Sequence, residues 1–272
     1  MNSARVAMVV PLPLRPVLTT DEEISLRHLT HFLGAYDKYF IAPKGIRFAR
    51  AGFEVIPFPR RYFGSARAHA RLQLSETFYS RFRAYDYILM YHLDALVLSD
   101  RLMEWCRTDL DYIGAPWVPC DDSPWVTRPR VGNGGFALIK VESFLTVMRS
   151  GQRSIDPDEY WRQFCATSPR HRQWLNLPRK YLKRLHAFNN VRWEMRRWPN
   201  LDGGTGSSDY FWSDEAVKYY PDFKVASFET GLRFAFEVAP RWCFEQNHRQ
   251  LPFGCHAWPR YDRSFWEPYL LK

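Results

Sequence analysis

Residues 88–100, ILMYHLDALVLSD, form an apolar run that carries a histidine and an aspartate near its middle. The run is typical of a buried β-strand, and a carboxylate inside such a strand is costly unless it is paired, hydrogen-bonded or bound to a metal ion. Alternate residues of a strand point to the same face, so His92 and Asp94 could converge on one ligand. An imidazole and a carboxylate at this spacing suit Mg²⁺ or Mn²⁺. The competing interpretation is an aspartate that accepts backbone N–H groups.

Strand-like and helix-like patterns alternate around this run over the first 120 residues. The predicted strands cover residues 5–10, 38–45, 53–59, 85–98 and 111–118, and the predicted helices cover 20–33, 71–82 and 99–108. Thr20 is expected to cap the first helix, because Glu23 follows three residues later as in a capping box. The alternation predicts an α/β fold with a mainly parallel sheet. Ligands bind such sheets at the carboxyl ends of the strands, and His92 and Asp94 lie toward that end.

The composition favours a single large domain with reduced thiols over a secreted or membrane-spanning protein. The chain has 272 residues, of which 46% are hydrophobic, enough to build the core of one large domain. Its five cysteines show no CxxC or zinc-type spacing, so we expect reduced thiols in a cytosolic protein. Residues 5–14 contain two prolines and precede no small-residue cleavage site, which favours a first strand over a signal peptide. No apolar run approaches the ~20 residues of a membrane-spanning helix.

The net charge of +9 is concentrated in one segment. Between residues 169 and 198 lie nine lysines and arginines against a single acid, Glu194, which accounts for +8 of the excess. Aromatic residues interleave with these cations, a composition that also suits stacking on nucleic acid. Within residues 181–198 the apolar side chains recur every three or four positions, which predicts an amphipathic helix. We expect it to lie on an anionic membrane surface, with packing on the protein's own core as the alternative.

Three further polar clusters are candidates for a site. Residues 132–135, GNGG, predict a glycine turn that lets the backbone approach a ligand, although an ordinary hairpin would use the same residues. Asp209 begins a predicted helix over 209–219 and is either a helix N-terminal residue or an active-site base after the glycine-rich stretch 202–206. His256 lies in a predicted loop beside small residues, where it is either structural or free to bind a metal ion.

These motifs, taken in order, resemble a known family. They are RYFGSARAHARLQLS (61–75), YDYILMYHLDALVLSD (85–100), DYIGAPWV (111–118), VGNGGFALIKVESFL (131–145), SSDYFWS (207–213) and LPFGCHAW (251–258). The chain resembles bacterial and viral glycosyltransferase-like proteins catalogued as a domain of unknown function, which are similar in turn to GT-A nucleotide-sugar glycosyltransferases. The resemblance implies one GT-A-like, Rossmann-like domain over residues 1–272 with a mixed, mainly parallel sheet. Residues 151–200 form a basic, partly helical insertion in it.

The resemblance also implies roles for these clusters. His92-Leu93-Asp94 takes the place of the Asp-x-Asp motif, whose carboxylate binds the metal bridging the donor diphosphate, and a histidine replaces the first aspartate. His256 matches a late histidine that completes the metal site. Gly134 and Gly135 match the loop that shapes the donor and acceptor pocket. Asp209 matches the catalytic acid, in a Ser-Asp pair where the family pattern has Glu-Asp.

Taken together, the motifs and their resemblance to this family imply a glycosyltransferase that moves a sugar from a nucleotide-sugar donor to a glycan or lipid-linked acceptor in surface polysaccharide synthesis. A divalent cation, Mn²⁺ or Mg²⁺, would neutralise the leaving diphosphate, and Asp209 would act as general base, with inversion if it lies opposite the leaving group. Arg67 and Arg71 are expected to contact donor phosphates. We expect a cytoplasmic protein, peripheral on the inner face of the membrane. The alternatives are a non-catalytic GT-A-like binding protein and a basic nucleic-acid-binding module.

Overall fold

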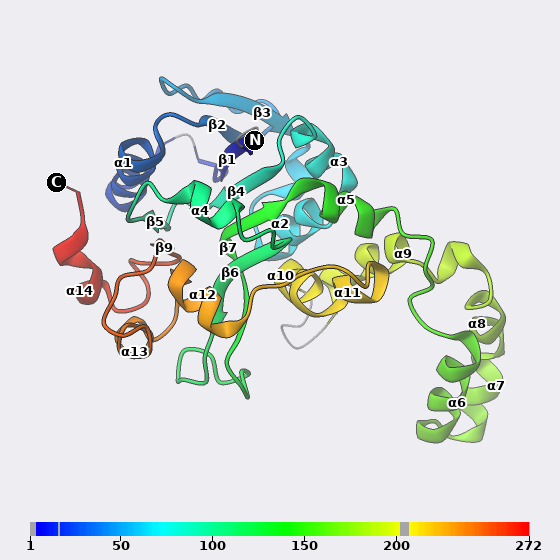
Figure 1. Cartoon of the computed structure of the whole chain (residues 1–272). Coiled ribbons are helices and arrows are strands. Elements are labelled where there is room, and N and C mark those ends of the chain that lie inside the picture. Colours follow the sequence, from blue (N-terminus) through cyan, green and yellow to red (C-terminus); the bar gives the residue numbers. More distant parts are fainter. Residues whose placement is uncertain (1–3, 16, 202–206, 272) are drawn as a thin grey trace.

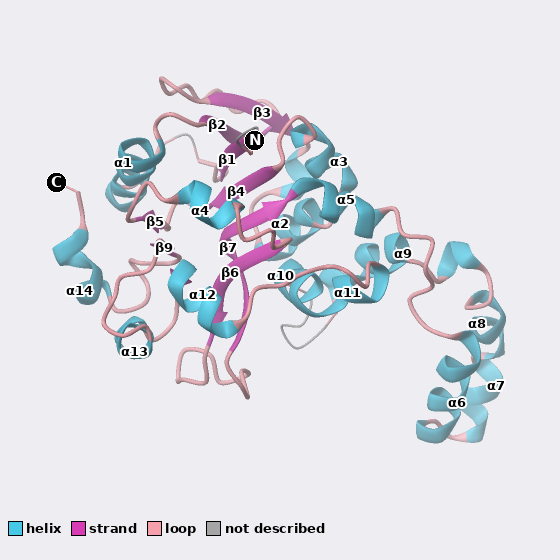
Figure 2. Ribbon diagram, in the orientation of Figure 1, coloured by secondary structure: helices cyan, strands magenta, loops and turns pink. Residues whose placement is uncertain are grey.

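The computed structural model describes residues 4–15, 17–201 and 207–271, and its centre is a six-stranded sheet (Figure 1, Figure 2). The strands are β1 (Val6–Pro11), β2 (Asp37–Pro43), β3 (Glu54–Phe58), β4 (Tyr87–Tyr91), β6 (Tyr112–Trp117) and β7 (Arg130–Lys140), in the order β3-β2-β1-β4-β7-β6. β7 alone runs antiparallel to its neighbours β4 and β6, while the other pairs are parallel. The prediction of a mixed, mainly parallel sheet is confirmed.

Helices cover both faces of this sheet (Figure 2). α1 (Thr20–Leu33), α4 (Leu102–Cys106) and α12 (Phe228–Phe234) pack on one face, and α2 (Ala66–Gln73), α3 (Glu76–Tyr79), α5 (Val141–Met148), α10 (Ser208–Tyr210) and α11 (Ala216–Tyr219) pack on the other. Neighbouring residues of β4 alternate between the two cores, so that Leu89 joins the first and Met90 the second. Burial on both faces explains why the strands are continuous apolar runs.

The strand predicted over residues 85–98 is shorter than expected. β4 ends at Tyr91, the chain turns with Ala95 N–H donating to His92 O at 3.0 Å, and Leu96 begins β5 (Leu96–Val97). β5 belongs to a second, three-stranded sheet with β8 (Ala235–Phe236) and β9 (Gly254–Cys255), in the order β5-β9-β8. His92 and Asp94 therefore lie in a turn between two sheets, and the argument from strand alternation was wrong.

Two other local predictions are corrected. The first helix is capped by Thr19, whose side chain accepts from Glu22 N–H in a capping box, one residue before the predicted cap at Thr20. The glycine turn predicted at 132–135 is part of strand β7, whose register against β6 shifts on both sides of Ala115. The helix predicted over 209–219 is confirmed as α10, a π-helical turn (Phe211–Glu215) and α11 in succession.

Residues 151–200, the segment predicted to be an insertion and called the insertion below, are largely helical. The helices are α6 (Pro157–Thr167), α7 (Arg170–Leu175), α8 (Leu177–Leu182) and α9 (Val191–Arg197), and α6 to α8 stand away from the sheet in Figure 1. α9 packs against the body through Val191 and Met195, both buried. The C-terminal part adds α13 (Pro240–Gln246) and α14 (Arg263–Trp266) beside the small sheet.

The single amphipathic helix predicted over 181–198 is wrong. α8 ends at Leu182 and α9 begins at Val191. The chain between these two helices is not α-helical, and Asn189 and Asn190 hold it in place. The Asn189 side chain donates to Lys183 O and Ile155 O, both at 2.8 Å, and the Asn190 side chain caps α9. The apolar residues thus form no continuous stripe, and the membrane-surface prediction loses its structural basis. No helix in the described part of the chain has the length and hydropathy to cross a membrane.

Candidate functional site

His92, Asp94 and His256 meet where β4 ends and β9 ends. One side-chain nitrogen or oxygen from each lies within 4.8 Å of those of the other two. Backbone hydrogen bonds hold the three segments in place: His92 N–H donates to Gly135 O at 2.8 Å, His256 N–H to Phe236 O at 2.9 Å, and the N–H of Trp258 to Asp94 O at 3.0 Å. The turn after β4 and the small sheet together bring residues that are 164 positions apart to one point.

His256 lies between two carboxylates. Its Nε2 is 3.3 Å from Asp94 Oδ1, and its Nδ1 is 2.9 Å from Oε1 of the buried Glu237. Burial lowers the pKa of His256, but Asp94 and Glu237 outweigh it and raise the pKa to about 10. Although burial raises the pKa of Asp94, His256 holds it well below its usual value. The cluster by itself is thus a protonated imidazole paired with carboxylates, and a metal ion bound there would displace that proton.

Glu237 connects the cluster to strand β7. Its Oε1 accepts from Asn133 Nδ2 at 2.7 Å, and the N–H of Gly135 donates to Asn133 Oδ1 at 2.9 Å. Its other oxygen, Oε2, is buried and has no hydrogen-bond partner among the residues that the structure describes. A carboxylate that orients a histidine through its far nitrogen is the usual support of a metal-binding imidazole.

A further histidine completes this side of the site. Nε2 of His69, on α2, lies 3.2 Å from Nε2 of His92, and the rings are inclined by 71°. Burial lowers the pKa of His69 to about 4, and burial together with the neighbouring imidazoles holds the pKa of His92 well below its usual value. Both rings are therefore neutral near pH 7, and one nitrogen of the pair donates while the other accepts.

A cavity of about 580 Å³ lies beside the cluster. Its lining includes His69, His92, His256, Arg67, Gly134, Gly135 and Asp209. The two glycines are needed for space: a Cβ on Gly135 would lie 2.1 Å from Nε2 of His256, and one on Gly134 would lie 2.5 Å from Oδ1 of Asp209. Only the backbone of strand β7 at Gly134 and Gly135 thus lies between His256 and Asp209.

Asp209 lies at the start of α10, is partly buried and lines the cavity. Burial raises its pKa to about 6, although a backbone hydrogen bond from Gly134 acts in the opposite direction. Ser208 Oγ donates to Asp209 Oδ1 at 3.2 Å. The cap of α10 is the Ser207 side chain, which accepts from Asp209 N–H at 3.2 Å. Because Ser207 already supplies the cap, helix capping does not explain a carboxylate at position 209 that faces the cavity. The stretch 202–206 before it lies outside the described residues.

The two predicted arginines separate in the structure. Arg67 is exposed on the first turn of α2 and lines the cavity. Arg71 faces a different hollow with Arg61, Arg192 and Arg196, and its Nη2 donates to Asn200 Oδ1 at 3.0 Å. The structure therefore does not bring Arg71 to the site.

A smaller hollow of about 300 Å³ adjoins the cluster on the side of the loop after β1. It is lined by Pro11, Leu12, Pro13, Glu22, His69, His92, Leu93 and Asp94. Since His69 and His92 line both spaces, the histidine cluster is the boundary between the β1 loop and the cavity that contains Asp209.

His69, Asn133 and Glu237 were not among the predicted site residues. Glu237 had the same signal as Asp94, because it interrupts an apolar run, AFEVA, at residues 235–239. Asn133 lies in the GNGG motif, for which a role was predicted only for the glycines. His69 has no distinctive signal: it is one polar residue on a helix that carries several.

Among the solved structures that resemble this chain are three glycosyltransferases. The chain is 10% identical to a glycosyltransferase involved in the glycosylation of the major capsid of PBCV-1, over 93% of this chain and 92% of that one, with a TM-score of 0.44. It is 12% identical to mouse xyloside xylosyltransferase 1 over 93% and 97% of the two chains, with a TM-score of 0.44. It is 13% identical to the glycosyltransferase GlyE of Streptococcus pneumoniae TIGR4, with a TM-score of 0.46, and spans 61% of that chain.

Sequence comparison gives the family. No curated protein matches the chain. One family model, described as "Protein of unknown function (DUF5672)", matches residues 52–256 and so covers five of the six motifs completely and ends within the last one. The expected membership in a family of unknown function is therefore confirmed: the chain belongs to the family DUF5672.

Proposed function

We propose that this chain is a glycosyltransferase that moves a sugar from a nucleotide-sugar donor to a hydroxyl of a glycan or lipid-linked acceptor, in the synthesis of a surface polysaccharide. The observation that carries the proposal is the composition of one cavity. His92 and His256, which form the cluster together with Asp94, line this cavity, and so does the partly buried Asp209. Sugar transfer needs both a place to neutralise the leaving diphosphate and a base for the attacking hydroxyl.

Asp209 is suited to act as the general base. With a pKa of about 6 it is largely ionised at pH 7 and still basic enough to accept a proton in the transition state. It lines the cavity and is partly buried, and a partly desolvated carboxylate interacts more strongly with a bound hydroxyl than one in water does. Because Gly134 has no side chain, Oδ1 of Asp209 can lie against strand β7 at this edge of the cavity. If attack proceeds from this side, opposite the leaving group, the anomeric configuration inverts.

The histidine cluster has a donor set that fits a divalent cation. Two imidazoles and one carboxylate converge, and Glu237 supports His256 from behind with one buried oxygen left unpartnered among the described residues. Carboxylates favour Mg²⁺ and Mn²⁺ and imidazoles favour later transition metals, so the mixed set favours Mn²⁺ over Mg²⁺. A cation held there would supply Lewis-acid stabilisation of the departing diphosphate.

The remaining lining residues suit the donor. Arg67, at the edge of the cavity, offers a guanidinium group that matches phosphate oxygens in geometry. The hollow formed by Pro11, Leu12 and Pro13 reaches the histidine cluster from the other side and is the place we assign to the nucleoside. The diphosphate would then lie beside His92 and Asp94, with the sugar in the larger cavity.

Calorimetry tests the donor site. Nucleoside diphosphates should bind the purified chain in the presence of Mn²⁺ and at least about tenfold more weakly in EDTA. Asp94→Asn should remove the Mn²⁺ dependence, because it deletes a ligand charge with little change of volume. Asp222→Asn makes the same change at an exposed position and should bind as the wild type does. Binding that is equal with and without Mn²⁺, or unchanged in Asp94→Asn, would contradict the assignment.

A further inference from the structure

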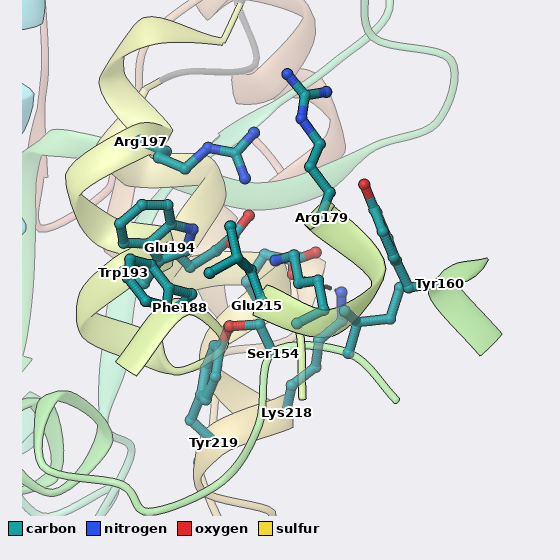
Figure 3. Close-up of a pocket in the computed structure, with 13 residues that line it drawn as sticks. Ser154, Tyr160, Arg179, Phe188, Trp193, Glu194, Arg197, Glu215, Lys218 and Tyr219 are labelled. Atoms are coloured by element: carbon teal, nitrogen blue, oxygen red, sulfur yellow. Dashed lines mark hydrogen bonds and ion pairs between the residues drawn. The ribbon is translucent and has the colours of Figure 1, made fainter. Parts of the chain in front are cut away.

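The insertion contains a second cavity, of about 590 Å³, between α6, α8, α9 and α11 (Figure 3). Its lining shares no residue with the cavity that contains Asp209. The volume falls within the range of ordinary small-ligand sites, ~300–1,000 Å³. Seven of the thirteen residues that line it lie between 179 and 197, in the basic, aromatic-rich segment that the proposed function leaves unused.

Aromatic side chains form opposite walls of this cavity. Phe188 and Trp193 lie on one side with their ring centroids 5.1 Å apart and their planes at 80°, and Tyr160 lies on the other (Figure 3). Nε1 of Trp193 is buried, and no described residue accepts a hydrogen bond from it. Buried donors in folded proteins are nearly always paired. This N–H has almost no accessible surface, so a ligand acceptor would reach it only after a neighbouring side chain moves aside.

The charged residues of the cavity are unevenly distributed. Lys218 pairs with Glu215, which leaves Arg179, Lys183 and Arg197 against Glu194. In Figure 3 the guanidinium groups of Arg179 and Arg197 reach the upper end of the cavity, whereas Glu215 and Lys218 lie below. Neither guanidinium forms an ion pair with any residue that the structure describes. One end is therefore cationic, and the other carries both acceptors and donors.

We infer that this cavity binds an acidic sugar, a hydroxylated ring that bears a carboxylate or a phosphate. The apolar face of such a ring would pack on Trp193 or Tyr160. Its hydroxyls would accept from the indole N–H and donate to Glu194. Its acidic group would lie at the cationic end, where Arg179 and Arg197 can form charge-assisted hydrogen bonds. An extended nucleic acid fits less well, because Glu194 and Glu215 would face its phosphates inside a site of limited volume.

This inference does not depend on the proposed function, since binding requires no transfer. If both hold, the insertion retains an acidic glycan at a distance from the catalytic cavity and so raises the local concentration of acceptor ends.

The test is equilibrium binding to the full chain by calorimetry. The probes are glucuronic acid, glucose 6-phosphate, methyl glucoside, a nucleoside monophosphate and a single-stranded RNA. One of the two acidic sugars should bind at least about tenfold more tightly than the neutral glucoside, and comparing the two identifies the anionic group. Arg197→Gln should weaken binding of that sugar by about tenfold, and Trp193→Phe by about threefold or more through loss of the N–H.

Matched variants in the same insertion show whether these losses of affinity are specific to the cavity. Trp174→Phe and Arg172→Gln make the same chemical changes on the exposed helix α7, outside the cavity, and should leave binding unchanged. Because Trp193→Phe also removes part of a ring that packs against Phe188, its melting temperature is measured alongside to confirm that the variant is folded at the assay temperature. Four results would each overturn the inference. They are equal affinity for acidic and neutral sugars, no binding of any sugar, and equal losses of affinity in the control variants. The fourth is tighter binding of the nucleotide or the RNA, abolished by Arg197→Gln.

Discussion

Replacing Asp209 by asparagine should make the protein more stable and less active at the same time. The asparagine keeps an oxygen that can accept from Ser208 and Gly134, and it removes the charge from a partly buried carboxylate. Active-site groups that are costly to bury but needed for chemistry show this trade-off. A residue that served only to stabilise a helix start would show the opposite change in stability.

The magnitude follows from the pKa of Asp209. Burial raises it from 3.8 to about 6, so the folded protein holds this proton more tightly than the unfolded chain does. Between these two pH values the free energy of unfolding falls as pH rises, by about 1.4 kcal/mol per pH unit. The penalty is absent below pH 3.8 and complete above pH 6, where it reaches roughly 3 kcal/mol. Asp209→Asn should therefore be more stable than the wild type by up to that amount at pH 7.5 and equally stable near pH 3.5.

Urea unfolding in EDTA at both pH values measures this difference, with Asp222→Asn as the exposed control. Activity is measured on the same preparations. Loss of a general base should lower kcat by ~10²–10⁴-fold with little change in donor affinity. The wild-type rate should fall tenfold per pH unit below about pH 6, and the variant should show no such dependence. A variant that is less stable than the wild type at pH 7.5, or as active as it, would refute the role of Asp209.

Three other changes test the histidine cluster. Asp94→Asn should abolish tight Mn²⁺ binding in calorimetry, since it removes the carboxylate from the donor set. Glu237→Gln should weaken Mn²⁺ binding by about 10–100-fold through its loss of support for His256, and an unchanged affinity would show that this support is unimportant. Gly135→Ala would place its Cβ 2.1 Å from Nε2 of His256 and should lower both the melting temperature and metal affinity. Gly151→Ala, with no atom within 4 Å of its Cβ, should do neither; equal effects of the two alanines would argue against the proposed contact.

The sheet was predictable because its strands are buried on both faces and so carry unbroken apolar runs. The end of β4 was not predictable, because the apolar residues continue through the turn into Leu96 and Val97, which pair with β9, a partner more than 150 residues away. The start of α1 was ambiguous, since Thr19 and Thr20 both precede a glutamate by three positions. The helix over 181–198 failed because Asn189 forms long-range bonds to Ile155 that no local periodicity reveals.

The site was predictable in part. His92, Asp94 and His256 were identified together from the family resemblance, and the structure places them together. The glycines were singled out, but for backbone freedom, whereas the structure needs them because Asp209 and His256 occupy the space of their side chains. Such a requirement depends on neighbours from other elements and cannot be deduced from the motif alone.

Turnover of a nucleotide sugar tests most directly whether the chain is a glycosyltransferase. The purified chain is incubated with a panel of donors and Mn²⁺, and release of the nucleoside diphosphate is followed for the wild type and for the variants Asp94→Asn, Asp209→Asn and Asp222→Asn. We expect release from at least one donor; it should be lost in EDTA and in the first two variants and retained in the third. Release from no donor, or equal release by all four proteins, would contradict the proposed transfer activity.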